Sequence, residues 1–137
     1  GTWRKIGGPA TSGSFHVLAA PIRVYDSRPG TAPAIGPKTK LVANAARTVD
    51  LTTGSAVPPG ATAALVTILL VNTASGNGNA TLWANGVARP SANTMVMGGT
   101  AGRFAITAVT AVDATAKVQI LSSLSTDVVL DVVGYYR

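Results

Sequence analysis

Short apolar runs, separated by clusters of glycine, proline, asparagine and serine, recur along nearly the whole chain. The runs are rich in the β-branched and aromatic residues that strands favour, and they are short for helices of globular proteins. A spacing of roughly 8–12 residues between such runs is typical of a sandwich, a jelly roll or a small barrel. We therefore expect an all-β, mainly antiparallel domain, a sandwich or jelly-roll-like fold, with about nine short strands. The expected strands are residues 15–18, 22–26, 47–51, 63–71, 80–84, 93–97, 104–112, 116–121 and 127–133.

The composition supports this fold class and limits its chemistry. The acidic residues number five, and all are aspartate. Because glutamate commonly fills exposed helical faces, its absence beside abundant threonine and valine argues against helices. The absence of cysteine excludes disulfides and thiolate metal sites. A length of 137 residues suits one domain; we expect it to span residues 14–137, after a Gly- and Pro-rich linker or neck at residues 1–13.

Two segments carry sharper structural predictions. Residues 63–71 are apolar on both faces of the expected strand, which predicts a central strand buried on both sides. Asn85-Gly86 is the strongest hairpin signal, because a two-residue type I′ turn needs positive φ at both positions.

The charge pattern limits the partners that we expect. The chain carries 11 lysines and arginines and a net charge of +6, but these cations are scattered rather than clustered. A nucleic-acid surface would gather them on one face, so we expect no nucleic-acid partner. No apolar segment reaches the roughly 18 residues that span a membrane, so we expect no membrane insertion. Only 12% of residues are charged and 47% are hydrophobic, which indicates contacts with further copies or other partner chains.

Catalytic chemistry has little support in the sequence. The one histidine, His16, lies in an apolar run without a neighbouring base or orienting group. One histidine and isolated aspartates do not make a zinc site, and no phosphate-binding or calcium-binding loop is present. A glycosidase would need two facing carboxylates, and none of the aspartates lies in a recognisable motif. We expect no catalytic residue, no metal and no cofactor; a hydrolase is the less favoured alternative.

Two groups of charged residues have a structural interpretation. Asp26 and Ser27 lie where a strand ends, and short polar side chains there can satisfy backbone donors. Asp131 stands among valines and leucine, so it is either on the exposed side of an edge strand or buried and paired. We expect a structural ion pair in which Arg28 or Arg103 meets Asp131, with ligand binding as the alternative.

Ligand binding is best placed around the Asn85-Gly86 turn. Aromatic rings cover the apolar faces of sugars while amide and guanidinium groups bind hydroxyls. The alternative is that Trp83 and one tyrosine belong to the core. The candidate ligand-binding residues are Trp83, Asn85, Arg89 and Asn93, with Tyr135 and Tyr136 as further exposed aromatics.

Several of these motifs occur together in an order that resembles a known family. The chain resembles β-rich modules of actinobacterial and other bacterial secreted or cell-surface proteins, and similar modules at the C-termini of bacteriophage minor tail or fibre proteins. The segments that carry the resemblance are residues 16–18, 21–28, 57–63, 83–86 with 89–90 and Asn93, and 131–136.

The resemblance implies an accessory role outside the cell, at the cell surface or on a virion. Such a role would be a trimerising head, an adhesion module or a receptor-binding tip, with no catalytic residue carried over. We therefore expect a homo-oligomer, a trimer in first place, that binds a receptor or a cell-surface glycan. The alternative is a purely structural trimerisation cap or capsid decoration domain.

Overall fold

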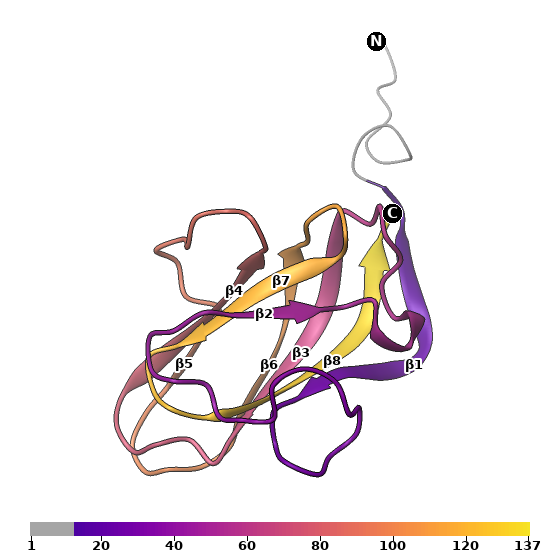
Figure 1. Cartoon of the computed structure of the whole chain (residues 1–137). Helices are drawn as coiled ribbons and strands as arrows, with labels where there is room; N and C mark the ends of the chain where they lie inside the picture. The colour runs from indigo at the N-terminus through magenta and orange to yellow at the C-terminus, as the bar shows by residue number, and fades with distance from the viewer. Residues whose placement is uncertain (1–12) are drawn as a thin grey trace.

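The computed structural model describes residues 13–137, and it is an antiparallel β-sandwich, as the sequence predicts (Figure 1). One sheet has the strand order β1-β8-β3-β6 and the other has β2-β7-β4-β5. The predicted linker falls almost entirely on residues 1–12, which lie outside the described part. The elements are β1 (Phe15–Asp26), β2 (Arg47–Asp50), the 3₁₀ turn η1 (Thr53–Ser55), β3 (Ala63–Val71), β4 (Gly78–Ala84), β5 (Met95–Met97), β6 (Phe104–Ala111), β7 (Lys117–Ser122) and β8 (Asp127–Tyr136).

The described chain has eight strands, because two runs that the sequence separates form one strand. Residues 15–18 and 22–26 both belong to β1, which pairs with β8 along its length. The register shifts between Val17 and Ile22 and again between Arg23 and Tyr25. Pro21 lies in the first irregular stretch, where a residue without a backbone N–H is tolerated. The apparent gap in the sequence pattern is therefore an irregular stretch inside a strand.

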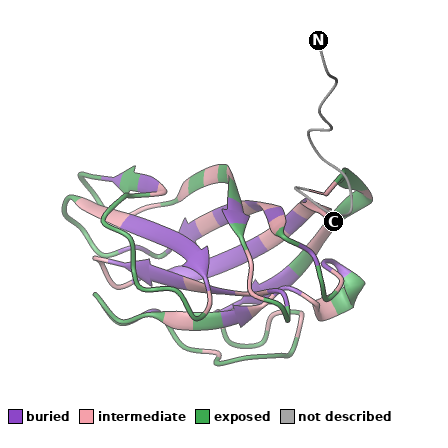
Figure 2. Cartoon of the chain, turned by 90° about the horizontal axis from the view of Figure 1, so that it is seen from above, coloured by how far each residue is buried: buried purple, intermediate pink, exposed green. Residues whose placement is uncertain are grey.

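The core lies between the two sheets, where alternate side chains of each strand meet. In β3 the inward residues Ala64, Val66, Ile68 and Leu70 are fully buried. The inward positions of β7 and β8, such as Ile120 and Leu130, are buried against them. Figure 2 shows the resulting alternation of buried and more exposed positions along the strands. Alternating burial is what an antiparallel sheet with one solvent-facing side requires.

The prediction that residues 63–71 are buried on both sides is wrong. β3 is central, with β8 on one side and β6 on the other, but its outward residues Leu65, Thr67 and Leu69 are only partly buried. The second sheet covers one face of β3, and no element of the described chain covers the other to the same extent. Apolar residues on the outer face therefore mark a surface rather than a second core layer.

The Asn85-Gly86 prediction is also wrong in its details. A turn forms there, but φ is positive only at Gly86, so the turn is not type I′. β4 ends at Ala84 and the chain runs through a loop to its partner β5. That loop folds back over β4, because Thr81 Oγ1 donates to the Ala92 carbonyl (3.2 Å) and Trp83 Nε1 donates to the Val87 carbonyl (2.9 Å).

Candidate functional site

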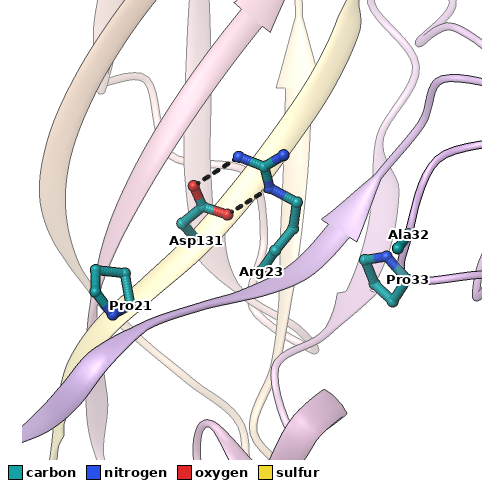
Figure 3. A pocket seen from close by; sticks show the side chains of 5 residues that line it. All are labelled: Pro21, Arg23, Ala32, Pro33 and Asp131. Carbon is teal, nitrogen blue, oxygen red and sulfur yellow. Dashed lines mark hydrogen bonds and ion pairs between the residues drawn. The ribbon is translucent and has the colours of Figure 1, made fainter.

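An open hollow of about 460 Å³ lies on the outer face of the sheet β1-β8-β3-β6. Its lining comes from β1, from β8 and from the loop that follows β1 (Figure 3). Two prolines and an alanine supply apolar surface, while an arginine and an aspartate supply the charged groups. The lining residues are Pro21, Arg23, Ala32, Pro33 and Asp131.

The charged groups of the hollow form a bidentate ion pair. Arg23 and Asp131 are directly opposed in the β1–β8 register. Arg23 Nε donates to Asp131 Oδ1 (2.9 Å) and Arg23 Nη2 donates to Oδ2 (3.2 Å). The hydrogen bonds that Arg23 donates to Asp131 raise the pKa of Arg23 and outweigh the opposing effect of burial. The arginine side chain is 43% exposed and the aspartate side chain 25% exposed, so the pair is accessible to a ligand.

A second ion pair lies beside the first and is more deeply buried. Asp26 is fully buried, and its carboxylate accepts hydrogen bonds from Arg28 Nη2 (2.7 Å), Nε (3.0 Å) and the Arg28 backbone N–H (3.1 Å). Burial alone would raise the pKa of Asp26, but the hydrogen bonds from Arg28 outweigh it and the pKa is lowered. Arg23 Nη1 lies 3.9 Å from Asp26 Oδ2, so the two ion pairs are neighbours.

The loop wall of the hollow is held by a lysine. Lys38 Nζ donates to three backbone carbonyls, those of Asp26 (2.6 Å), Pro33 (2.7 Å) and Thr31 (3.0 Å). An ammonium group has three N–H donors, so each has a partner here. The loop that carries Ala32 and Pro33 is thereby fixed against the end of β1.

Ser27 accepts a hydrogen bond from a backbone donor, as expected for a short polar side chain at a strand end, and it belongs to a buried network whose other members, Asp127 and Asn72, the sequence did not indicate. Its hydroxyl donates to Asp127 Oδ1 (2.8 Å) and accepts from the Val128 backbone N–H (2.9 Å). Asn72 Nδ2 donates to the other carboxylate oxygen, Oδ2, at 3.0 Å. These contacts tie the end of β1 to the starts of β8 and of the loop after β3. The sequence offers only a weak signal for them, because the partners lie far apart in the chain.

The expected ion pair of Asp131 with Arg28 or Arg103 is not formed. Asp131 lies on the outer face of β8, an interior strand, and meets Arg23. Arg28 is instead bound to Asp26, two residues away, and Arg103 lines a groove beside β5 and β6. The β1–β8 register decides the partner, and a register between strands so distant in the chain cannot be read from local sequence.

The four candidate ligand residues around the turn are not brought together as one open site. Trp83 is 8% exposed and is covered by the loop after β4, so its ring offers no free stacking face. Asn85 uses its amide within the protein: Nδ2 donates to Asp113 Oδ2 (2.9 Å) and Oδ1 accepts from Gln119 Nε2 (2.7 Å). Arg89 and Asn93 are exposed.

The two tyrosines lie at the C-terminal end of β8 beside the start of β1. Tyr136 contacts the ring of Phe15, with 5.0 Å between ring centroids, and Tyr135 stacks on His16 at 5.0 Å. His16 is exposed, and its imidazole ring lies against the ring of Tyr135.

We expect the turn at Asp113 to lose its stabilising contribution in acid. Hydrogen bonds lower the pKa of Asp113 to about 2, the largest from Asn85 and the next from the Lys117 backbone N–H. An unfolded aspartate titrates near 3.9, so the contribution is complete above about pH 4 and disappears as the pH falls towards 2. Asn85→Ala should shrink this part of the acid dependence, measured by urea unfolding between pH 2 and 6. An unchanged pH dependence would contradict the role of Asn85.

The described residues hold no group of three or more histidine, cysteine, aspartate or glutamate side chains placed to bind a metal ion. Among them there is also no helix long and apolar enough to cross a membrane.

The fold and the site define a class of protein: an antiparallel β-sandwich with an open hollow on one outer face that combines apolar surface with an ion pair. Neither the protein-family models nor the curated proteins contain a match to this chain. The resemblance to bacterial surface and phage fibre modules stays a prediction from the sequence.

Proposed function

We propose that this domain is a non-catalytic binding module of a surface or fibre protein, and that the hollow at Arg23 and Asp131 binds a neutral, hydroxyl-rich ligand such as a glycan. The observation that carries the proposal is the accessible bidentate ion pair of Arg23 with Asp131 inside an open hollow. The location at a cell surface, outside the cell or on a virion belongs to the same proposal.

The chemistry of the ion pair favours a neutral ligand over a charged one. The two side chains neutralise each other, so neither an anion nor a cation gains an uncompensated opposite charge. Two of the five guanidinium N–H groups are used in the pair, and each carboxylate oxygen can accept further hydrogen bonds. Hydroxyl groups donate and accept, so adjacent hydroxyls of a sugar can bind both partners at once. The prolines beside them offer apolar C–H surface to a sugar ring.

The surroundings of the carboxylates support a non-catalytic role. Asp26 and Asp131 are held by arginines, and Asp127 by Ser27 and Asn72. Asp50 and Asp113 accept hydrogen bonds from turn residues that follow them. A general acid or base needs a carboxyl or imidazole aimed at substrate with a pKa near the working pH. The lowered pKa values of Asp26 and Asp113 point away from that role.

The test is binding of neutral glycans on an array, followed by titration of the best binder against variants. We expect Asp131→Asn and Arg23→Met each to weaken binding by at least about tenfold. Asp131→Asn replaces one carboxylate acceptor with an amide donor, and Arg23→Met removes all the guanidinium donors. The exposed ion pair contributes about 1 kcal/mol or less to folding, so thermal unfolding should change little.

The matched control is the double variant Arg89→Met with Asn93→Ala, in the loop that the sequence favoured for binding. It should leave glycan affinity unchanged. Loss of affinity in this control with none in the Asp131 variant would move the site to that loop. Release of sugar products during the assay would indicate a hydrolase instead.

A second candidate function is purely structural assembly, the expected trimerisation cap. One observation favours it: the outer face of the sheet β1-β8-β3-β6 carries exposed apolar side chains. Phe15, Val17 and Val109 are 44%, 69% and 58% exposed on the strands of this sheet. Such a surface suits contacts with further copies. A trimer in solution that binds no glycan would support this candidate over the glycan-binding module.

A further inference from the structure

The four strand edges of the sandwich are protected to very different extents. Exposed strand edges invite pairing with other chains, and proteins blunt them with prolines, charges, irregularities or short length. β1 carries Pro21, Arg23 and two register shifts. β2 has four residues and includes Arg47 and Asp50, and β5 has only three residues. Three of the four edges therefore show at least one protective feature.

The remaining edge, β6, shows none of them. It has eight residues, Phe104–Ala111, without a charge, a proline or a glycine. Its pairing with β3 is regular over the full length, with no shift in register. In the described chain no strand pairs with its other side, since β6 is the end of its sheet. No described strand occupies its outer backbone edge, which leaves this edge available to a further strand; at the end of β6 the Ala111 carbonyl accepts a hydrogen bond from Thr110 Oγ1 (3.0 Å).

The core is also incompletely closed at this edge. A groove of about 580 Å³ runs between β5 and β6, and its lining includes Met95, Phe104 and Ile106. Phe104 and Ile106 pack against the core yet are only partly buried. A strand added alongside β6 would cover them and satisfy the edge backbone in one contact.

Charges at the two ends of β6 indicate which strand fits. Arg103 immediately precedes β6, is exposed and forms no ion pair within the described residues. Asp113 follows β6 by two residues and is ionised at neutral pH, since its pKa is about 2. Two antiparallel copies of β6 bring Arg103 of each copy towards Asp113 of the other, whereas parallel copies bring like charges together. The strand between these ends carries no charge. Two chains of net charge +6 therefore meet no local charge repulsion along this strand.

We propose that β6 pairs antiparallel with β6 of a second copy of this chain, which joins two four-stranded sheets into one of eight strands about a twofold axis. This inference is independent of the proposed glycan binding. It competes with the trimer expected from the sequence. In a twofold pair each copy uses the only unprotected edge among its described strands, so no such edge remains for a third copy.

The experiment uses two charged double variants on the exposed outer side of β6. One is Thr107→Lys with Val109→Lys, and the other is Thr107→Glu with Val109→Glu. In an antiparallel pair that brings Arg103 of one copy opposite Asp113 of the other, residue 107 of each copy lies opposite residue 109 of its partner, on the same face of the sheet. Two lysines, or two glutamates, at these positions therefore repel each other across the interface. We expect the unchanged chain to show a dimer mass in sedimentation equilibrium. Each double variant alone should dissociate at least about tenfold more readily.

The decisive measurement is an equimolar mixture of the two variants. Opposite charges then face each other, so the mixture should regain the dimer mass, as a heterodimer. The control is Val42→Lys with Val87→Lys, which makes the same charge change at exposed valines outside β6 and should leave the dimer intact. Thermal unfolding of each variant shows that the fold is retained.

A monomer at all concentrations, a trimer, or a dimer that neither charged variant disperses would each overturn this proposal. Failure of the mixture to regain the dimer would overturn it as well. None of these results affects the glycan-binding test, which reads affinity at Arg23 and Asp131.

Discussion

Asp26→Ala is expected to lower the free energy of unfolding by about 3 kcal/mol, the low end of the range for breaking a buried ion pair. Asp26 is fully buried, whereas the side chain of Arg28 is 31% exposed and can turn towards water when its partner is lost. The variant also removes the hydrogen bond that Asp26 accepts from the Arg28 backbone N–H. Urea unfolding at pH 7, followed by circular dichroism, measures the loss.

The same variant should change the acid dependence of stability. The pKa of Asp26 is lowered in the folded state, so its stabilising contribution is complete above about pH 4, the titration range of an unfolded aspartate, and is lost as the pH falls through the lower folded value. Asp26→Ala should therefore lack part of the destabilisation that the unchanged chain shows in acid. Asp131→Asn is the matched control, because its ion pair is exposed and should contribute about 1 kcal/mol or less. Equal losses in the two variants would contradict the distinction between a buried and an exposed pair.

Leu70→Ala is expected to destabilise the fold by about 3–4 kcal/mol, because the removed methyl groups leave a cavity between the two sheets. Leu70 is fully buried on the inner face of β3. Its neighbour Leu69 points to the outer face and is only partly buried, so Leu69→Ala should cost about 1 kcal/mol. The pair of variants has the same chemistry in the same strand, and urea unfolding of each measures the difference. Similar large losses would mean that both faces of β3 are covered, as the sequence pattern suggests.

The outer face of β3 shows why the sequence could not decide this point. An uninterrupted apolar run is compatible with burial on two sides, and equally with burial on one side and an apolar surface on the other. Which of these two arrangements forms depends on whether other parts of the chain cover both faces of the strand or only one. The second sheet covers the face of Ile68, and the described chain leaves the face of Leu65 partly open.

The candidate site shows the same division between local and long-range information. The sequence singled out Asp131 as an acid that needs explanation, and it singled out Arg28 and Arg103 as its candidate partners. Asp131 in fact pairs with Arg23, 108 residues away. The sandwich brings them together through the β1–β8 register, which no local pattern encodes. Trp83, similarly, is aromatic beside a turn, and only the return of the following loop shows that its ring is covered.

By itself the sequence determined the class of fold and most of the strands. Alternating apolar residues, β-branched side chains and turn residues act within a few positions of the chain, so their effect is readable locally. Only the tertiary structure decided the order of the strands, the partner of Asp131, the covered state of Trp83 and the position of β6 at an open edge. These features arise from contacts between distant segments, whose register and sheet order depend on how the whole core packs.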